Sequence, residues 1–180
     1  QYEYDFGMAM DVNGNIFLGG TFQDTVDFDP GPTTATLVAY GNGNGYVMKL
    51  DNSGNYVWAK SFDSTVVYGL ECDGQGNVLA TGCYAGNIDF DPGPAVTTLT
   101  SSLYYSNIFV LKLSSSGLFQ WAKGVGGNND DWGYSITSDQ ACNVYVTGDF
   151  QNFGDFDPGP ATTTLTSAGA WDIFVLSLNA

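Results

Sequence analysis

The chain has 180 residues, of which 43% are hydrophobic and 15% aromatic, so it is long and apolar enough to fold around a core. It carries 19 acidic residues against four Lys, with no Arg and no His, and its net charge is −15. This charge excludes nucleic acid and anionic membrane surfaces as partners. The absence of His excludes a Ser-His-Asp triad, a Cys-His pair and a His-ligated metal.

No run of about 20 apolar residues is present, so we expect no membrane insertion. The sequence starts with Gln and shows no signal peptide, which we interpret as a mature exported protein or a piece of a longer chain. We therefore expect a secreted, extracellular or cell-surface location. The three Cys (Cys72, Cys83, Cys142) lack the C-x-x-C spacing of a zinc knuckle. Their positions do not show whether any two of them form a disulfide.

One pattern repeats along the chain with a nearly constant step. The hexapeptide DFDPGP occurs three times, with spacings of 62 and 66 residues, at Asp27–Pro32, Asp89–Pro94 and Asp155–Pro160. In chain order, each copy opens with an aromatic-Gly pair, which we place at Phe6, Tyr68 and Trp132. Each copy continues with a strand-like run, which reads NIFLGG, NVLATG and NVYVTG in turn. In the first two copies this run follows a hairpin turn rich in Asp, Asn and Gly, at Asp11–Asn15 and Asp73–Asn77.

After DFDPGP each copy continues with a Thr-rich segment and a second strand-like run, which reads YVMKL, FVLKL and FVLSL in turn. These runs are apolar on both faces, as in strands that lie between two layers. A further turn leads to Trp-Ala-Lys in the first two copies only, at Trp58 and Trp121. Each copy therefore predicts two hairpins, or about four strands.

We predict an all-β fold of three tandem four-stranded antiparallel blades, β-propeller-like, with the third blade incomplete. The blades form a single repeat domain over residues 1–180, with copies at about 1–66, 67–130 and 131–180. In its D-x-x-G-N-V-Y-V-T-G, D-x-F-V-L-K-L and W-A-K-x-x-G-G runs the chain resembles the bacterial seven-bladed β-propeller repeat family. The resemblance implies a secreted or surface protein, and the DFDPGP loop departs from that family.

Propellers close with four to eight blades, so three blades leave an open edge that is a template for another chain. Three outcomes stay open: a closed ring of two copies, a head-to-tail filament, or an excerpt of a longer propeller. We favour a non-enzymatic extracellular structural protein that self-assembles as a homo-oligomer by completing blades between chains. The alternatives are an adhesin or lectin-type module that binds glycans or proteins, and a fragment of a larger secreted propeller.

The DFDPGP segments are candidate calcium sites, because two carboxylates two residues apart face the same side of an extended chain. Further oxygen ligands are expected at one repeat register before the second strand run. The candidate calcium ligands are Asp27, Asp29, Asp89, Asp91, Asp155, Asp157, Asn44, Asn107 and Asp172. The alternative is a rigid turn in which the Asp side chains cap backbone N–H groups.

Two Asp-Ser/Thr-apolar motifs are candidate bacterial O-glycosylation sites, with Thr25 and Ser64 as acceptors, and plain loop residues are the alternative. The four Lys fall in repeat registers, so we expect them to pair with Asp inside the fold. Trp58 and Trp121 repeat likewise and are predicted core residues. No catalytic residue is predicted, because the acidic residues lie in turns and repeated positions.

Overall fold

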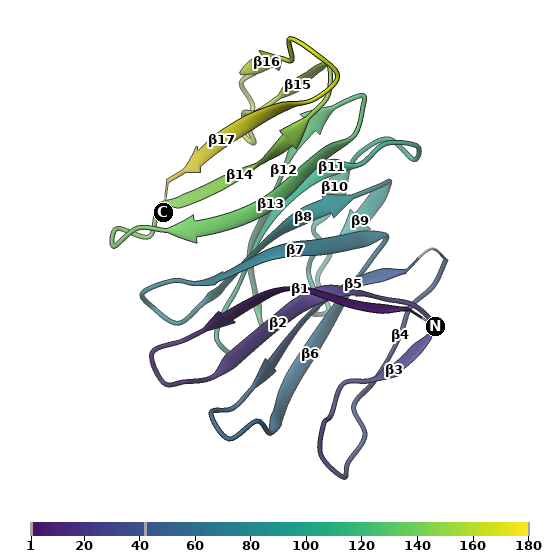
Figure 1. Ribbon diagram of the computed structural model, residues 1–180, viewed down its shortest axis with the longest axis vertical. Helices are drawn as coiled ribbons and strands as arrows, with labels where there is room; N and C mark the ends of the chain where they lie inside the picture. Colours follow the sequence, from purple (N-terminus) through teal and green to yellow (C-terminus); the bar gives the residue numbers. More distant parts are fainter. Residues whose placement is uncertain (1, 42, 180) are drawn as a thin grey trace.

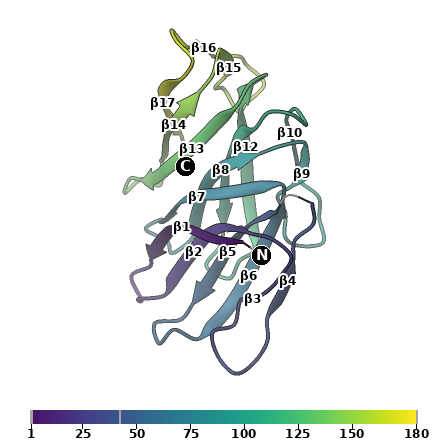
Figure 2. The same cartoon turned by 45° about the vertical axis from the view of Figure 1, so that its right-hand side comes forward.

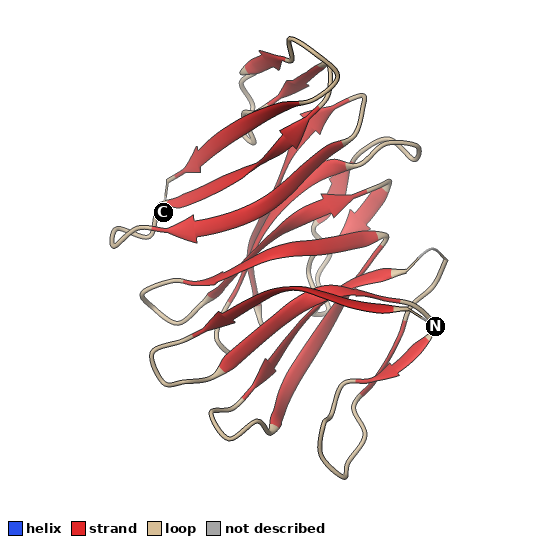
Figure 3. Cartoon of the chain, viewed as in Figure 1, coloured by secondary structure: helices blue, strands red, loops and turns tan. Residues whose placement is uncertain are grey.

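The computed structural model describes residues 2–41 and 43–179, and these residues form 17 β-strands and no helix (Figure 3). The described part of the chain therefore holds no helix long and apolar enough to cross a bilayer. The strands group into three blades, which follow one another from the lower to the upper part of the molecule (Figure 1). The predicted all-β, antiparallel, blade-like fold is confirmed.

The first blade is a four-stranded antiparallel sheet in the order β1-β2-β5-β6, with the hairpin β3-β4 inserted after its second strand. Its strands are β1 (Glu3–Met10), β2 (Ile16–Phe22), β3 (Thr25–Asp27), β4 (Thr36–Val38), β5 (Asn44–Leu50) and β6 (Tyr56–Asp63). The second blade repeats this order as β7-β8-β11-β12, with the inserted hairpin β9-β10. Its strands are β7 (Thr65–Cys72), β8 (Val78–Tyr84), β9 (Asn87–Asp89), β10 (Thr98–Thr100), β11 (Asn107–Leu113) and β12 (Phe119–Gly127).

The third blade has three main strands, in the order β13-β14-β17. Its strands are β13 (Asp131–Ser138), β14 (Val144–Phe150), β15 (Phe153–Asp155), β16 (Thr164–Thr166) and β17 (Asp172–Leu178). Its inserted hairpin, β15-β16, pairs with β12, the outermost strand of the second blade. The Asp residue that opens each DFDPGP motif ends the first strand of an inserted hairpin, a strand pair beyond the four strands that the sequence predicts for each copy.

The first strand of each blade is the inner one. Strand β7 lies between β1 and β13, and both views of the molecule show the three strands in this succession (Figures 1 and 2). Each of the three carries a β-bulge, where one extra residue interrupts the register with the next strand. The bulges fall between Asp5 and Gly7, between Val67 and Gly69, and between Gly133 and Ser135.

The bulges correct one assignment made from the sequence. The bulged residues are Phe6, Tyr68 and Tyr134, so Tyr134 is the structural counterpart of Phe6, and Trp132 is not. The aromatic-Gly pair at Trp132 is shifted by two residues from the repeat step. The 66-residue spacing of the DFDPGP motif leads from Tyr68 to Tyr134, and this signal was available in the sequence.

Two hydrophobic cores lie between the blades. One joins the first and second blades and includes Phe17, Trp58, Phe62, Phe90 and Phe109. The other joins the second and third blades and includes Leu79, Ile108, Val110, Val146 and Phe174. Because the central blade is covered on both faces, every residue of β8 is buried, whereas β14 alternates between buried and more exposed positions. A third cluster packs the first blade against its own inserted hairpin.

Candidate interaction surfaces

The DFDPGP turns are held by their own carboxylates. Asp89 Oδ1 accepts the backbone N–H groups of Asp91 and Thr97 at 3.0 and 2.8 Å, and Asp91 Oδ1 accepts that of Gly93 at 2.7 Å. The other two copies repeat this pattern at Asp27, Asp29, Asp155 and Asp157. Throughout the described ranges, no three Asp, Glu, Cys or His side chains gather into a group that fits a metal ion. The hydrogen bonds agree with the capped-turn alternative, and calcium binding stays a prediction.

The remaining candidate ligands lie at the first residues of β5, β11 and β17. Asn44 Nδ2 donates to Asp63 Oδ1 at 2.7 Å, and Asp172 Oδ2 accepts the N–H of Ala168 at 2.6 Å. Among the described residues, the buried Oδ1 atoms of Asn44 and Asn107 lack a hydrogen-bond partner. These two equivalent amides are therefore under-satisfied positions that recur from blade to blade.

The candidate glycosylation residues are both accessible. Thr25 is the first residue of the short strand β3, and Ser64 lies between the first and second blades with a φ of 46°. Both side chains are exposed. Both residues are therefore at the surface, and their modification stays a prediction.

Two of the four Lys form the predicted ion pairs inside the fold. Lys112 Nζ lies 2.8 Å from Asp73 Oδ2, and both side chains are almost fully buried. Lys49 Nζ lies 3.9 Å from Asp11 Oδ2 and also donates to the Ser115 carbonyl at 2.9 Å. Burial tends to raise the pKa of Asp73, but hydrogen bonds from Lys112 and Asn77 outweigh it and hold the pKa below the ordinary value. Both ion pairs lie within a single blade, and the bond from Lys49 to Ser115 also links the first blade to the second. The two lysines are therefore structural residues inside the fold.

The three cysteines are free thiols. Burial raises the pKa of Cys83 to about 11 and that of Cys72 to about 12. A thiol with such a pKa holds very little thiolate at neutral pH, so neither is a reactive nucleophile.

The first blade presents an apolar outer face that has no neighbour. Met8 is 72% exposed, whereas Leu70 and Ile136, at the equivalent position of the other two inner strands, are 8% and 5% exposed. Met10, two residues further along the same strand, is 67% exposed. The side chains have the character of a buried interface, but among the described residues this face is covered only by the inserted hairpin of its own blade.

The third blade presents the opposite face, also uncovered. Ile173 and Val175 are 80% and 75% exposed, although Ile108 and Val110, the same residue types at the same positions of β11, are both 0% exposed. A groove of about 260 Å³ crosses this face and is lined by β13, β14 and β17. The chain therefore ends in two different halves of one kind of interface.

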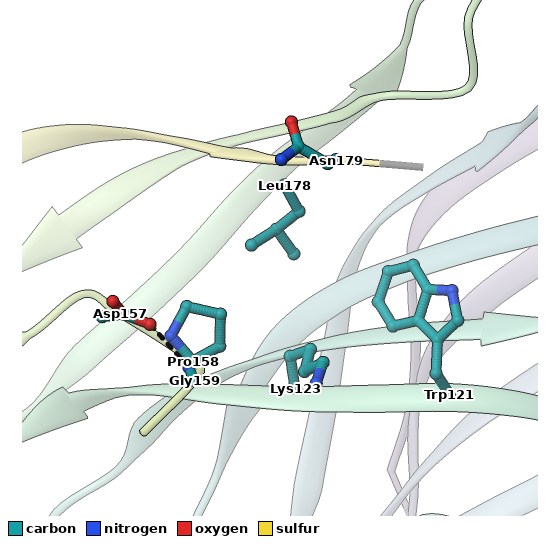
Figure 4. Close-up of a pocket in the computed structure, with 7 residues that line it drawn as sticks. All are labelled: Trp121, Lys123, Asp157, Pro158, Gly159, Leu178 and Asn179. Atoms are coloured by element: carbon teal, nitrogen blue, oxygen red, sulfur yellow. Dashed lines mark hydrogen bonds between the residues drawn. The ribbon is translucent and has the colours of Figure 1, made fainter. Parts of the chain in front are cut away.

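A larger hollow of about 510 Å³ lies beside the third blade, where the other blades have their fourth strand. Figure 4 shows Leu178 of β17 above the hollow, Trp121 and Lys123 of β12 below it, and the Asp157–Gly159 turn at one side. In the first blade the equivalent tryptophan, Trp58, is covered, and its Nε1 donates to the Ser115 carbonyl of the next blade at 3.2 Å. Trp121 is only half-buried.

An aromatic row crosses the inner strands of all three blades. The bulged residues repeat one geometry, since Phe6–Tyr68 and Tyr68–Tyr134 have centroid distances of 5.3 and 5.5 Å and interplanar angles of 60° and 59°. Ring contacts extend the row to Tyr4 and Tyr2 at one end and to Trp132 and Trp171 at the other. Sequence reasoning missed the row, because its members come together only when the inner strands lie side by side.

No protein-family model matches the chain. A WD repeat-containing protein of Acanthamoeba polyphaga mimivirus, itself described as uncharacterized, is 24% identical over 197 residues. The alignment covers 96% of this chain but only 14% of the viral protein. Together with the blades, this distant similarity indicates a propeller-type repeat fold, which is consistent with a protein-interaction module. The resemblance to the bacterial seven-bladed family stays a prediction.

Proposed function

We propose that this chain is a non-catalytic, extracellular assembly module whose two outer blade faces are covered by further blades, supplied by other copies of the chain. The single observation that carries the proposal is the contrast in exposure between equivalent residues. Met8 and Val175 are exposed where Leu70 and Val110 are buried. Exposed apolar residues that recur at regular positions of one blade face are typical of interaction surfaces.

The two exposed faces correspond to the two sides of the contact that neighbouring blades form inside the chain. Within the chain, one face of the first blade is covered by the opposite face of the second blade, and the second and third blades form the same kind of contact. The face of the third blade and that of the first blade are the two halves of a further contact of the same kind. A contact between unlike faces is heterologous and gives either a closed ring or a filament.

The test is the state of the purified chain in solution. We expect sedimentation velocity and negative-stain microscopy to reveal oligomers that grow with concentration. Met8→Lys and Val175→Lys are each expected to reduce association, because a charge in a covered apolar contact is costly. Val96→Lys is the matched control, since Val96 is also exposed, at 73%, but lies in the turn of an inserted hairpin. Discrete monomers at high concentration, with and without calcium, would contradict the proposal.

The alternative adhesin or lectin function is favoured by the aromatic row. Flat, exposed rings provide stacking surfaces for a sugar or for an aromatic side chain. If this function holds, a glycan array should give binders, and Tyr134→Ala should abolish their quenching of tryptophan fluorescence. An array without binders would count against it.

Calcium binding and O-glycosylation belong to the proposal as predictions. The calcium hypothesis predicts a higher melting temperature in calcium than in EDTA, and Asp89→Asn should reduce this difference by removing one carboxylate while retaining a hydrogen-bond acceptor for the turn. An identical melting temperature in both buffers would contradict it.

Intact mass of the native protein, compared with Thr25→Val and Ser64→Ala variants, tests glycosylation.

A further inference from the structure

The contact between neighbouring blades follows a rule of matched sizes. Between the first and second blades, Gly19 and Gly45 face Val67 and Thr65. A Cβ atom on Gly19 would lie 2.8 Å from Val67 Cγ1, and one on Gly45 would overlap Thr65 Oγ1. Glycine on the first blade therefore accommodates larger side chains on the second.

Between the second and third blades the sizes are reversed. Thr81 and Ile108 occupy the positions of Gly19 and Gly45, and Gly133 occupies the position of Val67. A Cβ atom on Gly133 would overlap Thr81 Oγ1 and lie 3.0 Å from Ile108 Cγ2. Large side chains on one blade thus require glycine on the next, because close-packed contacts do not tolerate an extra methyl group.

A second requirement comes from the bulges. The bulge carbonyl of each following blade approaches a glycine of the preceding one. A Cβ atom on Gly7 would lie 3.1 Å from the Tyr68 oxygen, and one on Gly69 would lie 2.8 Å from the Tyr134 oxygen. Both glycines stand directly after the bulged aromatic residue of their own strand.

The outer faces of the chain break both requirements. Thr147 and Ile173 of the third blade are the same residue types as Thr81 and Ile108, so they call for glycine on the blade that covers them. The first blade offers Asp5 at that position. In addition, the third blade carries Ser135 where the other two have Gly7 and Gly69.

We propose that a second copy of this chain docks its first blade on the third blade, and that Asp5 and Ser135 limit the affinity of this contact. The inference rests on the proposed function and extends it by naming the partner and the two residues. A second copy is the occupant because its first blade continues an interface that the chain already forms twice, and because its exposed Phe6 would extend the regular aromatic row beyond Tyr134. The two residues would hold the contact weak and reversible.

The experiment is a gain of association. The double variant Asp5→Gly with Ser135→Gly restores at both positions the residues used inside the chain. Relief of overpacking of about 1–3 kcal/mol corresponds to a self-association constant about 5- to 150-fold higher than that of the unmodified chain. Sedimentation velocity over a concentration series measures the constant.

Asp5→Asn with Ser135→Ala is the matched control, because it removes the charge and the hydroxyl group but keeps a Cβ atom at both positions. We expect this control to associate much like the unmodified chain.

Two further variants keep the outcome interpretable. Glycine at position 5 lowers the strand propensity of β1, so Asp5→Ala with Ser135→Gly is a second test, with a smaller gain expected. Val175→Lys added to the double glycine variant should abolish the gain.

A control variant that associates as tightly as the glycine variant would overturn the size rule, and so would glycine variants without any gain. If the unmodified chain associates and Val175→Lys prevents it, but glycine brings no gain, the size rule fails while the proposed function stands. A gain that survives Val175→Lys places the contact elsewhere and overturns the proposal.

Discussion

At the level of single residues, one buried ion pair stabilises the first blade and another stabilises the second. The two pairs differ in geometry. The Lys112–Asp73 pair is 2.8 Å long, whereas the Lys49–Asp11 pair is 3.9 Å long and Lys49 also has a carbonyl partner. Breaking a buried pair leaves an uncompensated charge, which costs far more than the loss of an exposed pair.

We therefore expect Asp73→Asn to lower the free energy of unfolding by about 3–5 kcal/mol and Asp11→Asn by about 1–2 kcal/mol. Urea unfolding at pH 7 measures both. Because the pKa of Asp73 is held below 3.8, its contribution is present above about pH 4 and is lost as the pH falls through the lowered pKa. Equal losses in the two variants would contradict this ranking.

Asp131 has the opposite behaviour. Burial raises its pKa to about 6, even though the backbone N–H groups of Gln151 and Gly127 donate to its carboxylate. Between pH 4 and 6 the folded protein holds a proton that the unfolded chain lacks, so stability falls as the pH rises.

The variant Asp131→Thr tests this behaviour, because Thr65 is the equivalent residue of the second blade. From pH 4 to pH 7 we expect the unmodified chain to lose about 2–3 kcal/mol relative to the variant, from the pKa shift at about 1.4 kcal/mol per pH unit. Free energies of unfolding of both proteins, measured from pH 4 to pH 7, test this expectation. A constant difference between the two proteins would show that Asp131 does not titrate there.

At the level of elements, equivalent strands contribute unequally to the free energy of unfolding. A strand contributes more where the next blade covers it. Trp58 on β6 is buried under the turn of the second blade, whereas Trp121 on β12 borders the hollow beside the third blade. Area removed from water determines the contribution of such a side chain.

We expect Trp58→Ala to lower the free energy of unfolding by about 3–5 kcal/mol, and Trp121→Ala by roughly half as much. Chemical denaturation followed by circular dichroism measures both values without relying on tryptophan fluorescence. A larger loss for Trp121→Ala would show that the outer strand of the second blade is covered in solution.

At the level of the whole molecule, the blades form a short array in which the two hydrophobic cores of the described residues join successive blades. The central blade is covered on both faces and the terminal blades on one. In such arrays stability is a sum of blade and contact terms, and opening starts at the ends.

Hydrogen exchange should therefore be slowest in β8 and β11 and fastest in β1 and β17. If the chain assembles as proposed, the terminal strands should gain protection as its concentration rises, while the central strands change little. Uniform protection at low concentration would contradict the array description.

Much of this fold was predictable because its turns and strands are encoded locally. The Asp-Asn-Gly turns close where expected, since Asp11 and Asp73 accept the N–H groups of their own loops. The inserted hairpins escaped notice because their strands are only three residues long and have little periodic signal. The candidate surfaces escaped it too, since exposure of Met8 or Val175 depends on whether a neighbouring blade is present.

The amino-acid sequence by itself determined the three repeats and the all-β class. These follow from short-range chemistry: alternating side chains, turn residues and the repeat step. Only the tertiary structure decided which faces are covered, that Tyr134 and not Trp132 occupies the third bulge, and that large and small residues alternate across the blade contacts. The physical reason is that burial and close packing belong to pairs of residues far apart in the chain, and no single segment carries both members of a pair.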